Sequence, residues 1–350
     1  MAGGERTLSQ RELNRALLAR QLLLEPGRGS LPRTLERIGG IQAQYAPSMY
    51  IGLFARLDGF EREALTQALE RRAVAQGTSL RSTIHLLSPA QWWRYAIAIR
   101  KPRRESWLAY RKEFEASQLD AAARRARKAL AGGRTLARKD LQDVVGLGAQ
   151  SITGINAWLD LVRVPPSGTW ERRRADVFAL AEDWLGEAPR IAVAEARNET
   201  VRDYLRAFGP ATPGDVASWS GLTLRQVRAA LDALELRRFR DEHGAELVDL
   251  PRQPLPDPET PAPVRFLPTW DATLLAHCRR TQILPEEYRP RVFSVKTPQS
   301  VPTFTVDGAV AGTWKYVRGS IRVEPFARLD RAAQRELDAE AERLAAFHAE

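Results

Sequence analysis

The chain contains 350 residues, of which 44% are hydrophobic, and it carries a formal net charge of +10 at pH 7. This length and apolar content support two or three domains with cores of their own, which excludes a disordered tail protein. The single Cys278 excludes an internal disulfide framework and a thiolate zinc cluster, and the four histidines lack metal-ligand spacing, so no metal or cofactor is expected.

Residues 1–88 have the pattern of helices followed by a small hairpin. Ser9 is the expected N-cap of the first helix, and the glycine pair Gly39-Gly40 is expected to end the second. Helices are predicted at residues 10–25, 32–38, 48–54 and 61–71. Residues 74–76 and 81–87 alternate like a short β-hairpin, and this order of elements is typical of a winged helix.

Residues 89–185 repeat this pattern in outline and contain a strongly basic segment. Helices are predicted at residues 89–101, 105–114, 117–130, 135–140 and, as a candidate recognition helix, 155–161. A hairpin with its tip at residues 165–168 follows, and its return strand at 169–174 makes it a candidate basic wing. Between Arg94 and Lys139 the chain has fourteen Lys or Arg and four acidic residues. This excess indicates a surface that attracts a polyanion, although a solvated helix face is the alternative.

The remaining residues divide into a third helical unit, a linker and a small β region. Residues 186–250 contain a helix at 199–208, a helix-turn-helix pattern at 212–231 and a wing at 236–250. Six prolines mark residues 251–263 as a stiff linker. In residues 264–326, strands are predicted at 293–295, 303–306, 309–315 and 320–323, with Asp307-Gly308 as a two-residue turn. Residues 327–350 are predicted to hold a C-terminal helix, so the fold class is mainly α with small β units, α+β.

Gln42 and Gln44 are two amides inside an otherwise apolar stretch. A buried amide without hydrogen bonds costs about 1–3 kcal/mol, so the protein, water or a ligand must supply partners. In a helix two residues so spaced cannot share one buried face, whereas in an extended segment or a tight turn both can line one pocket. Hydrogen bonding to the backbone near Gly39-Gly40 is the structural alternative.

The glutamine run resembles a family motif, and three later segments match the same family in order. The run Ile41-Gln42-Ala43-Gln44-Tyr45, with Ser48, Tyr50, Gly52, Leu53, Ala55 and Arg56, resembles the Gln-x-Gln motif of winged-helix DNA glycosylases of the AlkZ/YcaQ type. The later matches are Leu80-Arg81-Ser82-Thr83-Ile84-His85-Leu86, Phe266-Leu267-Pro268-Thr269-Trp270-Asp271 with Leu274, Leu275, His277 and Arg280, and Val306-Asp307-Gly308 with Gly312, Thr313 and Trp314. The resemblance implies three tandem winged-helix units followed by a small antiparallel β domain.

The resemblance also implies a monofunctional DNA glycosylase that releases cationic N7-alkylated purines from duplex DNA. In this interpretation Gln42 positions the attacking water and Gln44 shares that role. The other main branch of the family has a carboxylate at the second position, so this chain is expected to depend on a leaving group that is already cationic. The family further implies that interstrand crosslinks can be unhooked without extrusion into a closed pocket, and the sequence shows no spacing for an aromatic sandwich.

Further residues are candidates for the cleft or for DNA contacts. Candidate cleft residues are Tyr45, Ser48, Arg81, Thr83, His85, Trp270, Asp271 and His277. For Asp271 a helix cap is the alternative, and for His85 and His277 a packed or DNA-contacting role is the alternative to catalysis. Candidate DNA-binding residues are Arg100, Lys101, Arg103, Arg104, Arg172, Arg173, Arg174, Arg225 and Arg228.

The expected partner is double-stranded DNA carrying alkylated purines or crosslinks, bound by a monomer. The sequence has no run of eighteen uncharged apolar residues and no export pattern at its N-terminus, so a cytoplasmic protein, associated with the nucleoid when on DNA, is expected. A non-catalytic winged-helix DNA-binding regulator is the alternative function. A scaffold that does not bind nucleic acid is a third reading, which the basic segment disfavours.

Overall fold

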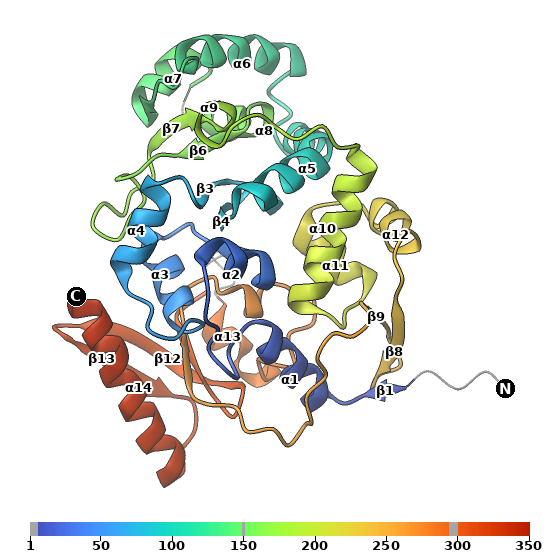
Figure 1. Ribbon diagram of the computed structural model, residues 1–350, viewed down its shortest axis with the longest axis vertical. Helices are drawn as coiled ribbons and strands as arrows, with labels where there is room; N and C mark the ends of the chain where they lie inside the picture. Colours follow the sequence, from blue (N-terminus) through green and yellow to red (C-terminus); the bar gives the residue numbers. More distant parts are fainter. Residues whose placement is uncertain (1–5, 149–150, 294–299) are drawn as a thin grey trace.

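The computed structural model describes residues 6–148, 151–293 and 300–350 as a mixed assembly of helices and three small sheets (Figure 1). The predicted strand at 293–295 falls mostly outside the described residues. None of the helices in these described ranges combines the length and the apolar character that a membrane span requires.

The N-terminal elements follow the predicted order, but the first helix ends at Arg20 instead of residue 25, and the strand predicted at residues 81–87 begins only at Ile84, after a 3-10 turn. The helices are α1 (Gln10–Arg20), α2 (Leu31–Ile38), α3 (Ala46–Phe54) and α4 (Arg62–Glu70), and the strands are β2 (Ile41–Gln42), β3 (Ala75–Thr78) and β4 (Ile84–Leu87). Ser9 caps α1 in a capping box with Glu12, and Gly39 ends α2 in the left-handed conformation. The glycine break therefore places Gln42 on a strand, and Gln44 lies two residues before α3.

Residues 89–185 differ from the prediction at several places: residues 136–137 form a strand, and the candidate recognition helix ends at Trp158 instead of residue 161. The elements are α5 (Pro89–Tyr110), α6 (Ala116–Leu130), β5 (Leu136–Ala137), α7 (Arg138–Val145), α8 (Ser151–Trp158), β6 (Leu161–Arg163), β7 (Val177–Leu180) and α9 (Ala181–Leu185). The predicted break at residues 101–105 is wrong, because α5 continues through Pro102. The Ala98 carbonyl, which lacks an amide partner at Pro102, accepts a hydrogen bond from Arg197 Nε at 3.3 Å. The predicted return strand at 169–174 is also wrong, since β7 begins only at Val177.

The strands of these two regions form one continuous sheet. Its order is β2-β4-β3-β6-β7-β5, so the hairpin β3–β4 joins β6–β7 through antiparallel pairing of Gly77 with Val162. A Cβ at Gly77 would lie 2.4 Å from the Trp92 ring and 2.7 Å from the Leu161 carbonyl. Only glycine allows this approach, so the sheet crosses the boundary predicted at residue 88.

The third region has the predicted order of helices and hairpin. Its elements are α10 (Val193–Phe208), α11 (Pro213–Ser220), α12 (Leu224–Asp232), β8 (Arg237–Asp241) and β9 (Glu246–Asp249). Thr212 and Thr223 form capping boxes, and Gly221 ends α11 in the left-handed conformation. The N-terminal strand β1 (Thr7–Leu8) pairs with β8 in parallel.

The C-terminal region consists of a four-stranded antiparallel sheet covered by a helix. Its elements are β10 (Arg265–Leu267), α13 (Arg289–Val292), β11 (Thr303–Val306), β12 (Ala309–Val317), β13 (Ser320–Pro325) and α14 (Arg331–Ala349), with 3-10 turns η2 (Ala272–Leu274) and η3 (Glu286–Tyr288). A further 3-10 turn, η1 (Leu80–Ser82), lies between β3 and β4 in the first region. Asp307 and Gly308, both with positive φ, form the predicted turn between β11 and β12.

Two features tie the regions together. Helix α10 contacts α1, α2, α5, α11 and α12, which makes it the centre of the main core (Figure 1). The C-terminal region shares a core with the first helices, where the Phe54 and Phe347 rings lie 4.6 Å apart. Arg56 and Asp271 form a buried bidentate ion pair across the same interface, at 2.8 and 2.9 Å. The sheet beyond the linker is therefore integrated with the N-terminal helices.

Candidate active site

Gln42 and Gln44 form one hydrogen-bonded pair at the edge of the six-stranded sheet. Gln42 ends β2, opposite His85 of β4, and is 6% exposed, whereas Gln44 is exposed in the bend that follows. Gln42 Nε2 donates to Gln44 Oε1. The bend thus brings both amides to one side of the chain. Their hydrogen bonds do not go to the backbone near Gly39 and Gly40, which was the structural alternative.

Arg81 determines the orientation of the Gln42 amide. Arg81 Nη2 donates to Gln42 Oε1 at 3.2 Å. Because a guanidinium has donors only, the atom that faces it must be the amide oxygen, and the amide NH₂ is thereby directed to Gln44. Among the described residues, the hydrogen bonds of the pair involve this guanidinium and no carboxylate.

Arg81 is itself held by a distant part of the chain. It lies in η1 with φ 52° and ψ 23°, a left-handed conformation that costs a non-glycine residue of order 1–3 kcal/mol. Its Nη1 donates to the Trp219 carbonyl at the end of α11, at 2.8 Å. Burial lowers the pKa of Arg81 to about 10, so it remains a cation at pH 7. Sequence reasoning named Arg81 as a cleft residue but gave no signal for the Trp219 carbonyl.

The arrangement leaves acceptor capacity on both amide oxygens. Each carbonyl oxygen has two lone pairs, and Gln42 Oε1 and Gln44 Oε1 each use one in the contacts described above. The second lone pair of the exposed Gln44 oxygen can accept a hydrogen bond from a water molecule. The site can therefore orient a water without a carboxylate base.

The histidines named from sequence are packed in the protein. His85 is buried with Nδ1 3.1 Å from the Thr83 carbonyl, and burial, with the positive charge of Arg81, lowers its pKa to about 3. His277 is buried with Nε2 3.0 Å from the Phe208 carbonyl, and burial lowers its pKa. Both rings are neutral at pH 7. Their arrangement agrees with the packed alternative.

Asp271, Thr83 and Trp270 also have local structural contacts. Asp271 caps η2 by accepting from the Thr273 amide at 3.0 Å, so the predicted cap is present, although the helix ends at Leu274. Burial acts to raise its pKa, but the Arg56 guanidinium and the hydrogen bonds from Thr273 outweigh burial and hold it below the usual value. Thr83 Oγ1 donates to the Leu80 carbonyl, and Trp270 has φ 60° with its amide bound to Ser300 Oγ.

Tyr45 and Ser48 line a cavity of about 240 Å³ beside the pair. Tyr45 directly follows Gln44, and its hydroxyl accepts from Arg173 Nη1 at 3.1 Å. The opposite wall comes from β12 and the end of α14, which no local sequence pattern connects with residues 45–48. Among the groups of His, Cys, Asp and Glu in the described residues, none is arranged to hold a metal ion.

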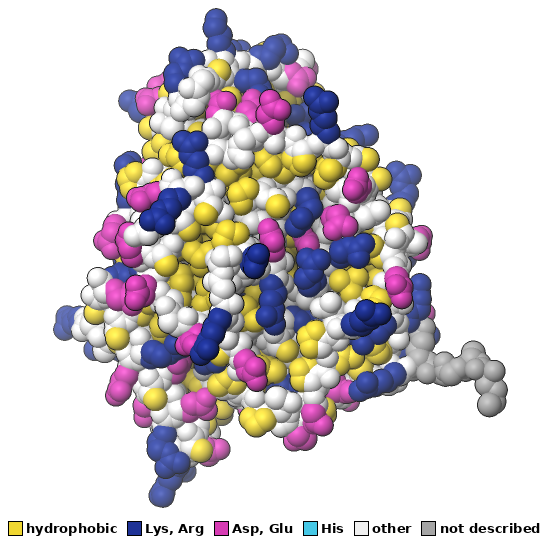
Figure 2. Space-filling view, viewed as in Figure 1, with side chains coloured by type: hydrophobic (Ala, Val, Ile, Leu, Met, Phe, Trp, Pro, Cys, Tyr) yellow, Lys and Arg dark blue, Asp and Glu magenta, His cyan; other side chains and the backbone are white. Residues whose placement is uncertain are grey.

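The predicted DNA-binding arginines of α5 have structural roles. Arg103 is 6% exposed and donates to the Thr78 carbonyl and to Asp160, so its prediction as a DNA contact is wrong. Arg100 also binds Asp160, and Arg104 donates to the carbonyls of Ala157 and Trp158. The remaining candidates are exposed and stay predictions: Lys101, Arg172, Arg173, Arg174, Arg225 and Arg228. Figure 2 shows Lys and Arg side chains over all parts of the face that it presents, interleaved with Asp and Glu.

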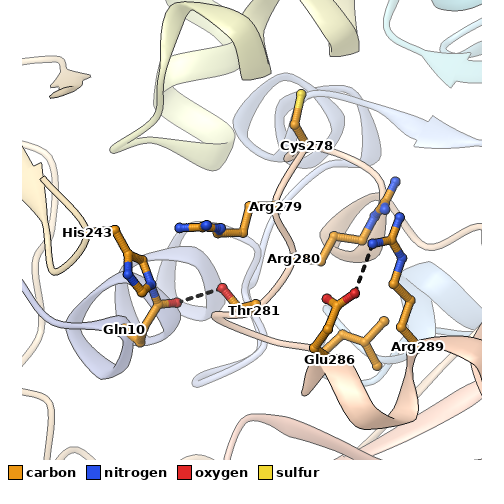
Figure 3. A pocket seen from close by; sticks show the side chains of 9 residues that line it. Gln10, His243, Cys278, Arg279, Arg280, Thr281, Glu286 and Arg289 are labelled. Carbon is orange, nitrogen blue, oxygen red and sulfur yellow. Dashed lines mark hydrogen bonds and ion pairs between the residues drawn. The ribbon is translucent and has the colours of Figure 1, made fainter. Parts of the chain in front are cut away.

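A larger cavity, of about 550 Å³, has an arginine-rich lining (Figure 3). Arg279, Arg280 and Arg289 line it, and Glu286 binds Arg289 at 3.0 Å. Burial lowers the pKa of Arg280, and the neighbouring Arg289 acts in the same direction. The Cys278 amide at its edge binds Asp215 in the first turn of α11. Helix α11 therefore holds both Arg81, through the Trp219 carbonyl, and the edge of this cavity, through Asp215.

Comparisons of the sequence and the structure with known proteins identify the family. The sequence model of the family described as DNA glycosylase AlkZ-like matches residues 35–347. No curated protein sequence matches the chain. Among solved structures, the DNA glycosylase AlkZ of Streptomyces sahachiroi has a TM-score of 0.82 and 21% sequence identity, covering 98% of this chain and 97% of that chain. At this identity the likeness establishes a shared fold. Because the family model spans most of the chain, the protein belongs to the AlkZ-like family of DNA glycosylases.

Proposed function

We propose that the protein hydrolyses the N-glycosidic bond of cationic N7-alkylated purines in duplex DNA, as a monofunctional DNA glycosylase. The observation that carries this proposal is the Gln42–Gln44 pair, whose amides are oriented by Arg81 and whose second oxygen is exposed. In the proposed reaction Gln42 and Gln44 together orient a water toward C1′. The resemblance implied the main role for Gln42, but the exposed Gln44 oxygen is the more accessible acceptor, and Gln42 also holds Gln44 in place.

The chemistry of the pair matches the charge of such a substrate. A neutral amide is a weak base, so it cannot compensate for a poor leaving group. An N7-alkylated purine already carries a positive charge and leaves as a neutral base without protonation. The enzyme then needs to position the water and the scissile bond, which contributes much of the rate in a well-oriented site.

The test is single-turnover base release from a duplex that contains one N7-methylguanine. Gln44→Ala is expected to lower the rate by about 100-fold, the scale on which a positioned proton acceptor contributes. Gln42→Ala is expected to lower it as well, because Gln44 loses its donor. Gln67→Ala, at a half-buried position of α4, is the matched control and should match the native protein. No release by the native protein, or equal release by all four proteins, would remove the proposal.

DNA contacts are proposed along the arginine-rich cavity and the exposed wings. The α11 residues that hold Arg81 and the Cys278 amide, Trp219 and Asp215, are four residues apart, which is about 6 Å along the helix axis. Arg280, which lines the cavity, also acts on the pKa of Arg81, so the arginine-rich cavity and Arg81 belong to one region of the surface. We propose that the cavity holds a backbone phosphate near the lesion. Replacing Arg279 by Ala should then reduce affinity for any duplex and make the dependence of affinity on salt less steep, with Arg252→Ala as an exposed control.

The units that carry these contacts are proposed as tandem winged helices in a monomer. The proposed divisions are residues 1–88, 89–185, 186–250, 251–263, 264–326 and 327–350. The order α11, α12, β8, β9 supports this interpretation for the third unit. A regulator that kept the fold without the chemistry is the competing function, and tight, sequence-specific binding to undamaged duplex without base release would favour it.

A further inference from the structure

The cavity beside the glutamine pair has aromatic walls from segments far apart in the sequence. Tyr45 precedes α3, Trp314 and Tyr316 lie on β12, and His348 ends α14. The Tyr316 and His348 rings stack with centroids 4.2 Å apart and planes 13° apart, and Trp170 meets His348 edge-on at 5.0 Å. Tyr45 and Tyr316 remain 42% and 38% exposed. Tyr45 and Tyr316 therefore line the same cavity and are both accessible from the surface.

Two polar atoms in the lining have no partner in the described part of the chain. Ser48 is 2% exposed, and its Oγ makes no hydrogen bond; His348 Nε2 is buried and also makes none. A buried polar atom without a partner costs about 1–3 kcal/mol, so such atoms call for an explanation. Burial, with the positive charges of Arg62 and Arg173, lowers the pKa of His348 to about 4. At pH 7 the ring is neutral, and its free nitrogen can meet either a donor or an acceptor.

The cavity is linked to the proposed site of hydrolysis by the chain itself, since its lining includes Tyr45 but not the glutamines. Tyr45 is the residue after Gln44, and consecutive Cα atoms are about 3.8 Å apart. Pockets for drug-sized ligands measure about 300–1,000 Å³. The volume of about 240 Å³ therefore suits one ring system rather than a whole nucleotide. Arg173 and Lys315 line its charged side, where a phosphate attached to such a ring could lie.

We propose that this cavity binds one planar heteroaromatic ring, the alkylated purine, which stacks against the exposed rings of Tyr45 and Tyr316. Its edge bonds to Ser48 Oγ and His348 Nε2, which are buried and without partners before binding and must turn toward the ring. The proposal rests on the proposed function for the identity of the ring. It changes the sequence-based expectation that the lesion has no aromatic site, because the rings come from four separate segments. The ring can arrive attached to DNA or remain as the free base after cleavage.

The first experiment measures binding of free 7-methylguanine by titration calorimetry. The native protein is expected to bind it, Tyr316→Ala to bind about tenfold more weakly, and Ser48→Ala about fivefold more weakly. Tyr110→Ala, which removes an exposed tyrosine from the end of α5, should bind like the native protein. Ser48→Ala removes an atom without a partner, so its thermal midpoint should not fall, which separates loss of binding from loss of folding.

The second experiment measures lesion preference without turnover. In the Gln44→Ala background, the affinity ratio between duplexes with N7-methylguanine and with guanine is compared with and without Tyr316→Ala. If Tyr316→Ala abolishes the preference for the lesion, the cavity binds the base while it is attached to DNA. If the ratio is unchanged but free base binds, the cavity binds the released product. If free base does not bind and Tyr316→Ala leaves the ratio unchanged, the proposal is overturned. Ring binding without any base release by the native protein would instead contradict the proposed function alone.

Discussion

At the scale of single residues, the site depends on a strained arginine. Arg81 adopts φ 52° so that one guanidinium can reach both the Trp219 carbonyl and the Gln42 amide. Strain of this kind persists where the surrounding contacts enforce it, and it is concentrated at functional sites. The contacts of Arg81 thus fix which end of the Gln42 amide faces Gln44.

Arg81→Gly should separate the guanidinium from the backbone strain. Glycine accepts a positive φ without cost, so the turn should fold, while the Gln42 amide loses its donor. A hydrogen bond to a charged group contributes about 1.5–3 kcal/mol, which corresponds to a decrease of about 10- to 100-fold in single-turnover base release. Arg252→Gly, at an exposed residue with φ 60°, is the matched control. Unchanged release by a folded Arg81→Gly protein would show that Arg81 does not orient the pair.

At the scale of elements, α5 shows how a proline is accommodated inside a helix. Pro102 cannot donate to the Ala98 carbonyl, and Arg197 of α10 supplies the missing donor at 3.3 Å. The same helix is fastened to α8 by Arg104 through the carbonyls of Ala157 and Trp158. Arg197 of the neighbouring helix thus replaces the backbone hydrogen bond that Pro102 cannot make, and Arg104 of α5 itself joins the helix to α8.

A double-mutant cycle tests this compensation. Arg197→Ala should lower the free energy of unfolding by about 1 kcal/mol, because the Ala98 carbonyl loses its partner. In a Pro102→Ala background the loss should be smaller, since the new amide at position 102 can donate to that carbonyl. Urea unfolding of the four proteins measures the difference. Equal losses in the two backgrounds would contradict the compensation.

Sequence patterns predicted the elements that local signals define. The Ser9 cap and the Asp307-Gly308 turn lie where they were expected, and the helix-turn-helix predicted at residues 212–231 is present, with capping boxes at Thr212 and Thr223. The pairing of β3 with β6 could not be predicted, because it depends on Gly77 fitting between Trp92 and a strand more than eighty residues away. The same limit applied to the site, where the glutamine pair was predicted but its anchor at Trp219 was not.

At the scale of the whole molecule, several histidines are buried as neutral rings. Burial lowers the pKa of His85 to about 3 and of His348 to about 4, and it also lowers that of His277. In the unfolded chain a histidine has a pKa of about 6.5. Between these values the unfolded state binds more protons than the folded state, so folding becomes less favourable as the pH falls.

The free energy of unfolding should therefore be fully retained above pH of about 6.5 and decrease as the pH is lowered toward 4. His277→Asn keeps an N–H group near the Phe208 carbonyl but does not titrate. The free energy of unfolding of this variant should therefore fall with pH less steeply than that of the native protein, by up to about 1.4 kcal/mol per pH unit. Urea unfolding at a series of pH values provides the measurement. A native stability that stays constant from pH 7 to pH 5 would contradict the assignment of neutral buried histidines.

The central claim is that the positive charge of the substrate makes the base a good leaving group, so that no acid is needed to protonate it and the glutamine pair need not supply one. It is tested by single-turnover release of N7-methylguanine and of hypoxanthine, a neutral base, from duplexes of the same sequence. The expected result is release of N7-methylguanine with release of hypoxanthine at least about 100-fold slower, the scale of general-acid assistance. Equal rates for the two bases, or faster release of hypoxanthine, would contradict the account.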